Sequence, residues 1–194
     1  VKMTFIQSFD LSIAQAAGRL REAAGGFFTP LFKAITLSGT VGAVFIAAAI
    51  VFIIFRKTRK CGITAGIALL FGLLFTNILM KNIIARPRPY SDVSSEFYIL
   101  WVKAGSLKES GFSFPSGHAT AATAFSLSAF LFFDKKYSWL FLIIPIVMGF
   151  TRIYFVVHYA TDVLGGFLSG SAAAICAKLV TDALQNFEWF KKIT

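Results

Sequence analysis

The sequence has few charged side chains and almost no cysteine. Asp, Glu, Lys and Arg make up 14% of its 194 residues, whereas soluble domains carry roughly 25%. The two cysteines, Cys61 and Cys176, stand far apart in apolar or membrane-edge contexts, which does not support a disulfide framework. Aromatic residues are abundant, with 23 phenylalanines, and this excludes a disordered chain. The length allows one domain.

Acidic residues are scarce relative to basic ones. The chain has 9 Asp and Glu against 19 Lys and Arg, a formal net charge of +10. In a soluble protein this excess would indicate nucleic acid as a partner. The mean hydropathy is +0.73, however, and the cytoplasmic loops of membrane proteins carry the same basic excess. We therefore expect a lipid bilayer, and no nucleic acid, as the partner.

Five apolar stretches are long enough, or nearly so, to cross a membrane as helices. A bilayer core of about 30 Å needs roughly 20 apolar helical residues. The stretches are either uncharged or charged only near their ends. With one further helix at the N-terminus, they predict an all-α integral membrane bundle of six helices. The predicted spans are residues 34–55, 62–80, 117–133, 138–157 and 160–181.

The short loops predict the orientation of these spans. Basic clusters at residues 56–60, 135–136 and 191–192 fall on one side of the membrane if the spans alternate. That side should be cytoplasmic. We expect a multi-pass protein of the plasma membrane, with a polar loop at residues 86–115 outside and a tail at residues 186–194 inside.

The first 30 residues differ from the predicted spans. They place apolar residues near helical spacing but also carry Asp10, Arg19, Arg21 and Glu22, which is too polar for a span. This pattern is typical of a helix lying in the membrane interface. The sequence starts with Val1 rather than Met, and we therefore expect a further segment upstream.

Titratable groups gather at the outward ends of the predicted helices. Three of them, Lys81, Arg88 and Arg152, are cations that suit an anion with several oxygens, because arginine forks bind phosphate in a bidentate manner. Ser116 and Gly117 open a predicted helix, whose free N–H groups and positive dipole end also favour an anion. Glycine allows close backbone approach and serine adds a hydroxyl donor.

Both histidines of the chain belong to this outward set. His158 and Asp162 stand four residues apart and would share one helix face. A carboxylate that holds one imidazole nitrogen leaves the other free to attack, as in an activated nucleophile. His118 could then protonate a leaving oxygen. Taken singly, each cation could be a membrane-edge anchor and Asp162 a helix-end charge. Arg86 is interpreted as a surface or loop cation, and Thr76 and Asn77 as polar residues that pack between helices.

These residues resemble the motifs of the type 2 phosphatidic acid phosphatase (PAP2) family. Lys81 is followed by six residues and then Arg88-Pro89, which is similar to the first motif; Pro115-Ser116-Gly117-His118 is similar to the second. The third is Arg152, five residues, His158, three residues and Asp162, with Thr151 where the family usually has Ser. The chain looks especially like small bacterial members that act on phosphatidylglycerol phosphate or undecaprenyl pyrophosphate.

The resemblance implies a phosphatase of lipid phosphates that needs no metal or other cofactor. The domain would be membrane-embedded and span residues 31–185. The three cations, with Ser116 and the Gly117 amide, would hold the phosphoryl group. His158 would form a phosphohistidine, Asp162 would orient it and His118 would protonate the leaving group. The sequence agrees about the metal, since it shows no carboxylate pair or His/Cys cluster with ligand spacing.

Other functions remain as alternatives. Phosphatidic acid, another lipid phosphate or a sugar phosphate could be the substrate. The soluble haloperoxidases of the same family are disfavoured by the predicted spans. A small-solute transporter would place charges near the bilayer midplane and repeat its helices, and the sequence does neither. A non-catalytic scaffold would give no reason to keep both histidines beside three cations.

We also expect the lipid to enter sideways between helices, since its phosphate lies level with the outward helix ends.

Overall fold

The computed structural model describes residues 3–194, and over that range the chain forms helices and loops without a strand. Val1, on which the expectation of an upstream segment depends, lies outside the described residues. Shorter 3₁₀ segments join several helices, and a π-helical segment, η3 (Leu74–Met80), joins α3 to α4. The α-helices are α1 (Phe5–Ser38), α2 (Ala43–Ile54), α3 (Arg59–Leu73), α4 (Lys81–Ile84), α5 (Glu96–Lys103), α6 (Gly117–Phe132), α7 (Lys135–Ser138), α8 (Ile143–Tyr154), α9 (Ala160–Leu184) and α10 (Glu188–Ile193).

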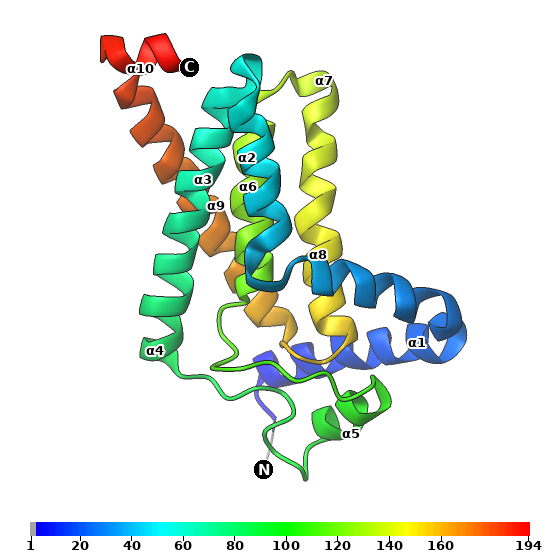
Figure 1. Ribbon diagram of the computed structural model, residues 1–194. Coiled ribbons are helices and arrows are strands. Elements are labelled where there is room, and N and C mark those ends of the chain that lie inside the picture. Colours follow the sequence, from blue (N-terminus) through cyan, green and yellow to red (C-terminus); the bar gives the residue numbers. More distant parts are fainter. Residues whose placement is uncertain (1–2) are drawn as a thin grey trace.

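Helix α6 runs through the middle of an upright bundle and contacts α2, α3, α8 and α9 (Figure 1). Small residues make this close packing possible. Ala119, Ala122 and Ala124 of α6 are completely buried. On α9, a Cβ atom at Gly166 would lie 2.7 Å from the Ser116 carbonyl oxygen, and one at Gly170 would lie 2.5 Å from that of Thr120. Small residues at such contacts let helix backbones approach closely.

The first predicted span, residues 34–55, is broken. Helix α1 ends at Ser38, and the chain bends by 59° before α2 begins at Ala43. Gly42 adopts a left-handed conformation with φ of 72°, which glycine tolerates without a steric cost. A Cβ atom at Gly39 would lie 2.6 Å from Met148 Cε, the end of a flexible side chain of α8.

Three helical stretches in residues 3–194 are long and apolar enough to cross a membrane: residues 56–84, 135–154 and 160–184. The bent pair α1–α2 would add a fourth if it were one span. Helix α6 occupies the predicted span 117–133 but has 16 residues, and it is enclosed by its neighbours. The structure therefore supports an apolar helical bundle, while the number of five spans with one interfacial helix stays a prediction.

Helix α1 lies across one end of the bundle rather than alongside the upright helices (Figure 1). It contains a kink at Ala24 and continues to Ser38, beyond the 30 residues expected for the interfacial helix. Its exposed side includes Phe5 and Phe27, whereas Asp10, Ala14 and Ala17 face inward and are buried. Because α1 has one apolar exposed side and one packed side, it contributes side chains to the interior of this end of the molecule.

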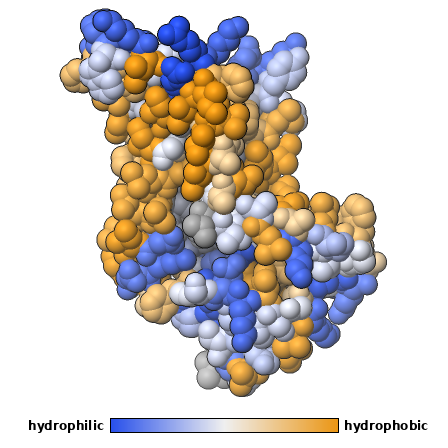
Figure 2. All heavy atoms as spheres, in the orientation of Figure 1, coloured by the Kyte–Doolittle hydropathy of each residue, from blue (hydrophilic) through white to orange (hydrophobic). Residues whose placement is uncertain are grey.

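The two ends of the bundle are polar and the middle is apolar. Figure 2 shows hydrophilic surface at the top and bottom, separated by a hydrophobic band. The α2–α3 connection, α7 and α10 all lie at the top (Figure 1), so the three basic clusters share one end as predicted. The opposite end carries α1, α5 and the loop between α4 and α6.

Candidate active site

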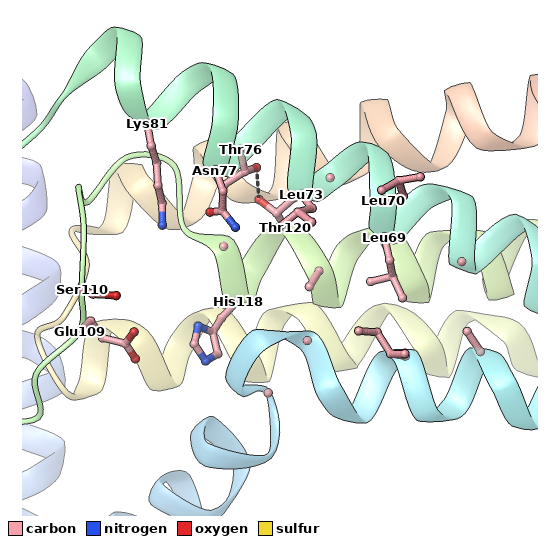
Figure 3. Close-up of a pocket in the computed structure, with 18 of the residues that line it drawn as sticks. Leu69, Leu70, Leu73, Thr76, Asn77, Lys81, Glu109, Ser110, His118 and Thr120 are labelled. Carbon is pink, nitrogen blue, oxygen red and sulfur yellow. Dashed lines mark hydrogen bonds between the residues drawn. The ribbon is translucent and has the colours of Figure 1, made fainter.

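One cavity at the α1 end of the bundle brings together five of the predicted site residues. It has a volume of about 550 Å³. In Figure 3, Lys81 and Asn77 point into it from one side, and His118 and Glu109 from the other. The other predicted residues, Ser116, Arg152 and Asp162, are buried behind the lining. The predicted residues that line the cavity are Lys81, Arg88, Gly117, His118 and His158.

His158 and Asp162 form the pair that the sequence predicts. His158 lies in the turn between α8 and α9, and its Nδ1 is 3.5 Å from Oδ2 of Asp162, in the first turn of α9. The same carboxylate oxygen accepts hydrogen bonds from the Tyr159 N–H at 2.8 Å and from the Ser113 hydroxyl. This arrangement favours a proton on Nδ1 and leaves the lone pair on Nε2, which lies 3.4 Å from Arg88 Nη1.

His158 is held neutral by its surroundings. Burial lowers the pKa of His158 to about 4, and the positive charges of Arg152 and Arg88 act in the same direction. The contact with Asp162 opposes this effect but does not reverse it. The imidazole is therefore uncharged at neutral pH, which is the form with a free lone pair.

Arg88 is fixed by backbone carbonyls. Its guanidinium donates to the carbonyl oxygens of Ser110 at 2.7 Å, Gly111 at 2.9 Å and Val157 at 2.9 Å. Only 5% of Arg88 is exposed. The loop before α6 and the turn before α9 thus hold the guanidinium at the cavity wall, next to His158.

The Lys81 side chain lies close to Gly117, the first residue of α6. A Cβ atom at Gly117 would lie 4.0 Å from Lys81 Nζ and 3.6 Å from Asn77 Oδ1. The π-helical segment η3 carries Thr76 and Asn77; such segments often mark functional sites. The Thr76 hydroxyl lies 3.0 Å from that of Thr120 in α6, which confirms its role in packing between helices, and both Thr76 and Asn77 line the cavity (Figure 3).

Ser116 begins α6 rather than lining the cavity. Its side chain accepts a hydrogen bond of 3.5 Å from the Ala119 N–H, and its backbone N–H donates to the Asp162 carbonyl oxygen at 3.0 Å. The hydroxyl of Thr151, which stands where the family usually has serine, bonds the Met148 carbonyl of its own helix at 2.7 Å. Both side chains therefore stabilise helix ends next to the site.

Glu109 is a site residue that the sequence analysis missed. It lines the cavity, and its carboxylate forms an ion pair with Arg152. Arg152 also donates to the Thr36 hydroxyl. Burial alone would raise the pKa of Glu109, but Arg152 and the other positive charges nearby together have the larger opposite effect. The pKa of Glu109 is therefore below its ordinary value, and the carboxylate is ionised. Glu109 lies in a loop without a motif, and only the folded chain brings it to Arg152.

Arg86 lies in a loop, as interpreted, but it is not a solvent-facing surface cation, because it forms ion pairs with two buried carboxylates. Its guanidinium donates to Asp162 Oδ1 at 2.6 Å and to Asp10 Oδ2 at 2.8 Å, and it stacks on the Tyr159 ring at 3.8 Å. Burial opposes its charge, but the carboxylates of Asp162 and Asp10 raise the pKa of Arg86 above its ordinary value. The signal was missed because Asp10 and Asp162 are both distant in sequence.

A buried histidine–carboxylate pair with converging cations, at one end of an apolar helical bundle, defines a membrane phosphatase in chemical terms. Residues 61–185 match the PAP2 superfamily. An undecaprenyl-diphosphatase from Sulfolobus acidocaldarius is 30% identical over 161 residues, which cover 75% of this chain and 74% of the relative. The chain therefore belongs to the PAP2 superfamily, whose phosphatases are hydrolases that act on lipid phosphates without a metal.

Two further comparisons agree. The undecaprenyl-diphosphatase BcrC from Bacillus subtilis is 34% identical over 131 residues, which cover 68% of this chain and 63% of the relative. The crystal structure of a transmembrane PAP2-type phosphatidylglycerolphosphate phosphatase from Bacillus subtilis matches 96% of this chain and 90% of that chain. Its TM-score is 0.68 and its sequence identity is 25%.

Proposed function

We propose that this protein removes a phosphate group from phosphatidylglycerol phosphate, undecaprenyl pyrophosphate or both, with His158 as the nucleophile. One observation carries the proposal: a single cavity has His158, Lys81 and Arg88 at one end and an apolar groove at the other. A lipid phosphate has the same division between a charged head and a hydrocarbon tail. The names of the relatives from Sulfolobus acidocaldarius and Bacillus subtilis support both substrates.

Phosphate binding would use Lys81, Arg88 and the backbone at the start of α6. Arg88 is already oriented by backbone carbonyls, so its side chain loses little conformational freedom when phosphate binds. The N–H groups at Gly117 lie at a helix N-terminus, which favours an anion. Arg152 would add charge from behind the lining, and Ser116 would hold the helix start. Removing one donor aimed at a developing negative charge typically costs about 3–4 kcal/mol of barrier.

In the first chemical step, Nε2 of His158 attacks phosphorus. A nitrogen–phosphorus bond forms, and the bond breaks from phosphorus to the ester oxygen of a monophosphate or to the bridging oxygen of a pyrophosphate. Asp162 would keep Nδ1 protonated and the ring oriented. His118 would donate a proton to the departing oxygen; its Nε2 is buried and has no hydrogen-bond partner among residues 3–194, so it is available for the substrate.

In the second step, water attacks the phosphohistidine. The deprotonated His118 accepts a proton from this water, the nitrogen–phosphorus bond breaks, and inorganic phosphate leaves. His158 is then neutral again. No step requires a metal ion, and the charge of the transferred group is balanced by the cations of the site.

The tail of the lipid would lie in the apolar part of the cavity. This groove runs along α2 and α3, and its walls include Ile46, Ile50, Ile53, Leu69 and Leu73. Several of these side chains are exposed on the outside of the bundle, where the hydrocarbon of a membrane would cover them. The groove therefore supports sideways entry from the bilayer.

The membrane placement follows from the same reasoning. The basic clusters lie at one end of the bundle (Figure 1), whereas Lys81, Arg88 and His158 line the part of the cavity at the other end. Basic loops favour the cytoplasm. We infer an active site on the outer side of the plasma membrane. We also keep the proposed organisation into an N-terminal amphipathic segment (1–30), a membrane-embedded phosphatase domain (31–185) and a cytoplasmic tail (186–194).

The test is phosphate release in detergent from phosphatidylglycerol phosphate, phosphatidic acid and undecaprenyl pyrophosphate, with and without EDTA. We expect the wild type to turn over phosphatidylglycerol phosphate, undecaprenyl pyrophosphate or both, and to keep its activity in EDTA. His158→Ala should show no turnover. A second variant, His118→Ala, should lose less activity on a substrate whose leaving group needs no proton. Activity of His158→Ala near that of the wild type would contradict the proposal.

A further inference from the structure

Asp10 is buried at the end of the molecule that holds the candidate active site, and both of its carboxylate oxygens accept hydrogen bonds. It comes from α1, outside the residues 61–185 that match the family, and is 1% exposed. Its Oδ1 accepts the backbone N–H of Thr161 at 2.9 Å. Its Oδ2 accepts the Thr161 hydroxyl at 2.8 Å and Arg86 Nη2 at 2.8 Å. Asp10 thus binds both the first turn of α9 and the guanidinium of Arg86.

Arg86 connects Asp10 to Asp162. Its Nη1 donates to Asp162 Oδ1 at 2.6 Å and to the Thr161 hydroxyl at 2.7 Å, while Nη2 binds Asp10. The Tyr159 ring covers one face of the guanidinium at 3.8 Å. Contacts on several sides leave Arg86 few alternative positions, so the oxygen of Asp162 that it binds is fixed in direction.

The two oxygens of Asp162 divide their contacts. Oδ1 faces Arg86, and Oδ2 faces His158 Nδ1 and the Ser113 hydroxyl. A carboxylate is planar, so fixing one oxygen determines where the other points. If Arg86 moves, the plane of Asp162 can rotate, and the imidazole loses the partner that sets its tautomer and orientation.

We propose that Asp10 is a positioning residue for the nucleophile: through Arg86 it holds Asp162 against His158, so that α1 completes the active site. This inference rests on the proposed role of His158. Asp10 and Arg86 do not line the cavity, so they do not touch the phosphate. Their effect should therefore fall on the chemical step rather than on substrate binding.

The kinetic test uses Asp10→Asn, Arg86→Gln and the double variant. Asparagine keeps the shape of Asp10 but presents an amide to groups that need an acceptor. We expect each single change to lower kcat about 10- to 100-fold, as losing an outer partner of a catalytic group does, with KM changed by less than about twofold. Because Asp10 acts through Arg86, the double variant should be no slower than Arg86→Gln alone.

The control is Glu22→Gln, an acidic residue of the same helix, whose ion pair among residues 3–194 is an exposed one with Lys103 at 3.5 Å. It should keep the wild-type kcat. Thermal unfolding of all variants identifies any that do not fold. Wild-type kcat in folded Asp10→Asn, a raised KM alone, or losses that multiply in the double variant would each overturn the proposal.

A second readout does not depend on turnover. The chain has two histidines, so ¹⁵N-histidine NMR gives two imidazoles, which His118→Gln assigns. We expect wild-type His158 to carry its proton on Nδ1, and Asp10→Asn to shift it toward a mixture of tautomers. An unchanged spectrum in Asp10→Asn would contradict positioning. If the spectrum changes but His158→Ala still turns over, the proposed function fails while the positioning contact stands.

Discussion

The Glu109 carboxylate contacts the Arg152 guanidinium at the cavity that also holds His118. Arg152 was predicted as a phosphate ligand, yet in this structure its charge is already balanced by a carboxylate. Since Arg152 holds the pKa of Glu109 below its usual range, that carboxylate is ionised at neutral pH. An incoming phosphate therefore meets a negative side chain beside the cation that should attract it.

Glu109→Gln should strengthen the binding of inorganic phosphate. Removing the negative charge frees Arg152 for the anion, and we expect the inhibition constant of phosphate to fall roughly fivefold. The measurement is product inhibition of lipid phosphate hydrolysis. Glu96→Gln is a suitable control, because Glu96 bonds Gln15 outside the cavity. An inhibition constant that rises or stays the same in Glu109→Gln would show that the ion pair does not compete with phosphate.

The acid limit of activity should be set by His158. Its pKa is lowered to about 4 by burial and by Arg152 and Arg88, so the neutral, attacking form persists down to that pH and disappears below it. We expect kcat to stay nearly constant from pH 7 to 5 and to halve near pH 4. Measurement of kcat between pH 3.5 and 8 in a stable detergent checks this. A fall of kcat to half near pH 6.5, the ordinary pKa of histidine, would contradict this prediction.

Asp162→Asn should reduce kcat by about 10³- to 10⁴-fold, the loss seen when a catalytic histidine has the wrong tautomer partner. The carboxylate is completely buried against His158 and Ser113, so the amide changes the hydrogen bonds with little change in volume. Rates are compared at equal amounts of folded protein, judged by circular dichroism. A mild effect would show that Asp162 only stabilises the N-terminal end of α9 as a helix-end charge.

Gly66→Leu should discriminate between substrates by the length of their tails. Gly66 lines the groove, and a Cβ atom placed there would meet no other part of residues 3–194 within 4 Å, so a larger side chain can extend into the space proposed for the lipid tail. We expect kcat/KM to fall about tenfold for long-chain substrates, with little change for a short-chain soluble analogue. Gly26→Leu, at an equally open position on α1, is the control. Equal losses on both substrates would contradict a tail groove here.

The sequence predicts the chemical groups of the site but not how they are paired. His158, Asp162, Lys81, Arg88 and His118 are recognisable because their spacing is local and their types fit phosphate chemistry. The structure brings them to one end of the bundle, as expected from alternating spans. These residues were predictable because each sits at the end of an apolar stretch, and the ends of spans on one side must meet.

The remaining contacts depend on distant parts of the chain. Asp10 is 76 positions from Arg86 and 151 from Thr161, and Glu109 is 43 from Arg152. No periodicity or motif connects such pairs. The break at Gly42 was missed for a different reason: residues 34–55 are apolar throughout, and hydropathy does not report a left-handed glycine. Helix packing, rather than composition, decides where α1 ends and α2 begins.

The glycine contacts between α6 and α9 have a consequence for selectivity. His158 lies two residues before α9, and His118 stands in the first turn of α6, so the close contact of these backbones at Gly166 and Gly170 helps to set the spacing of the two imidazoles. A side chain at either glycine would collide with the α6 backbone, so the two helices are in close contact there. Adaptation to a new substrate would instead have to change α2 and α3, which form the other wall and carry none of the reacting groups. Chemistry and substrate choice can therefore diverge independently during evolution of this fold.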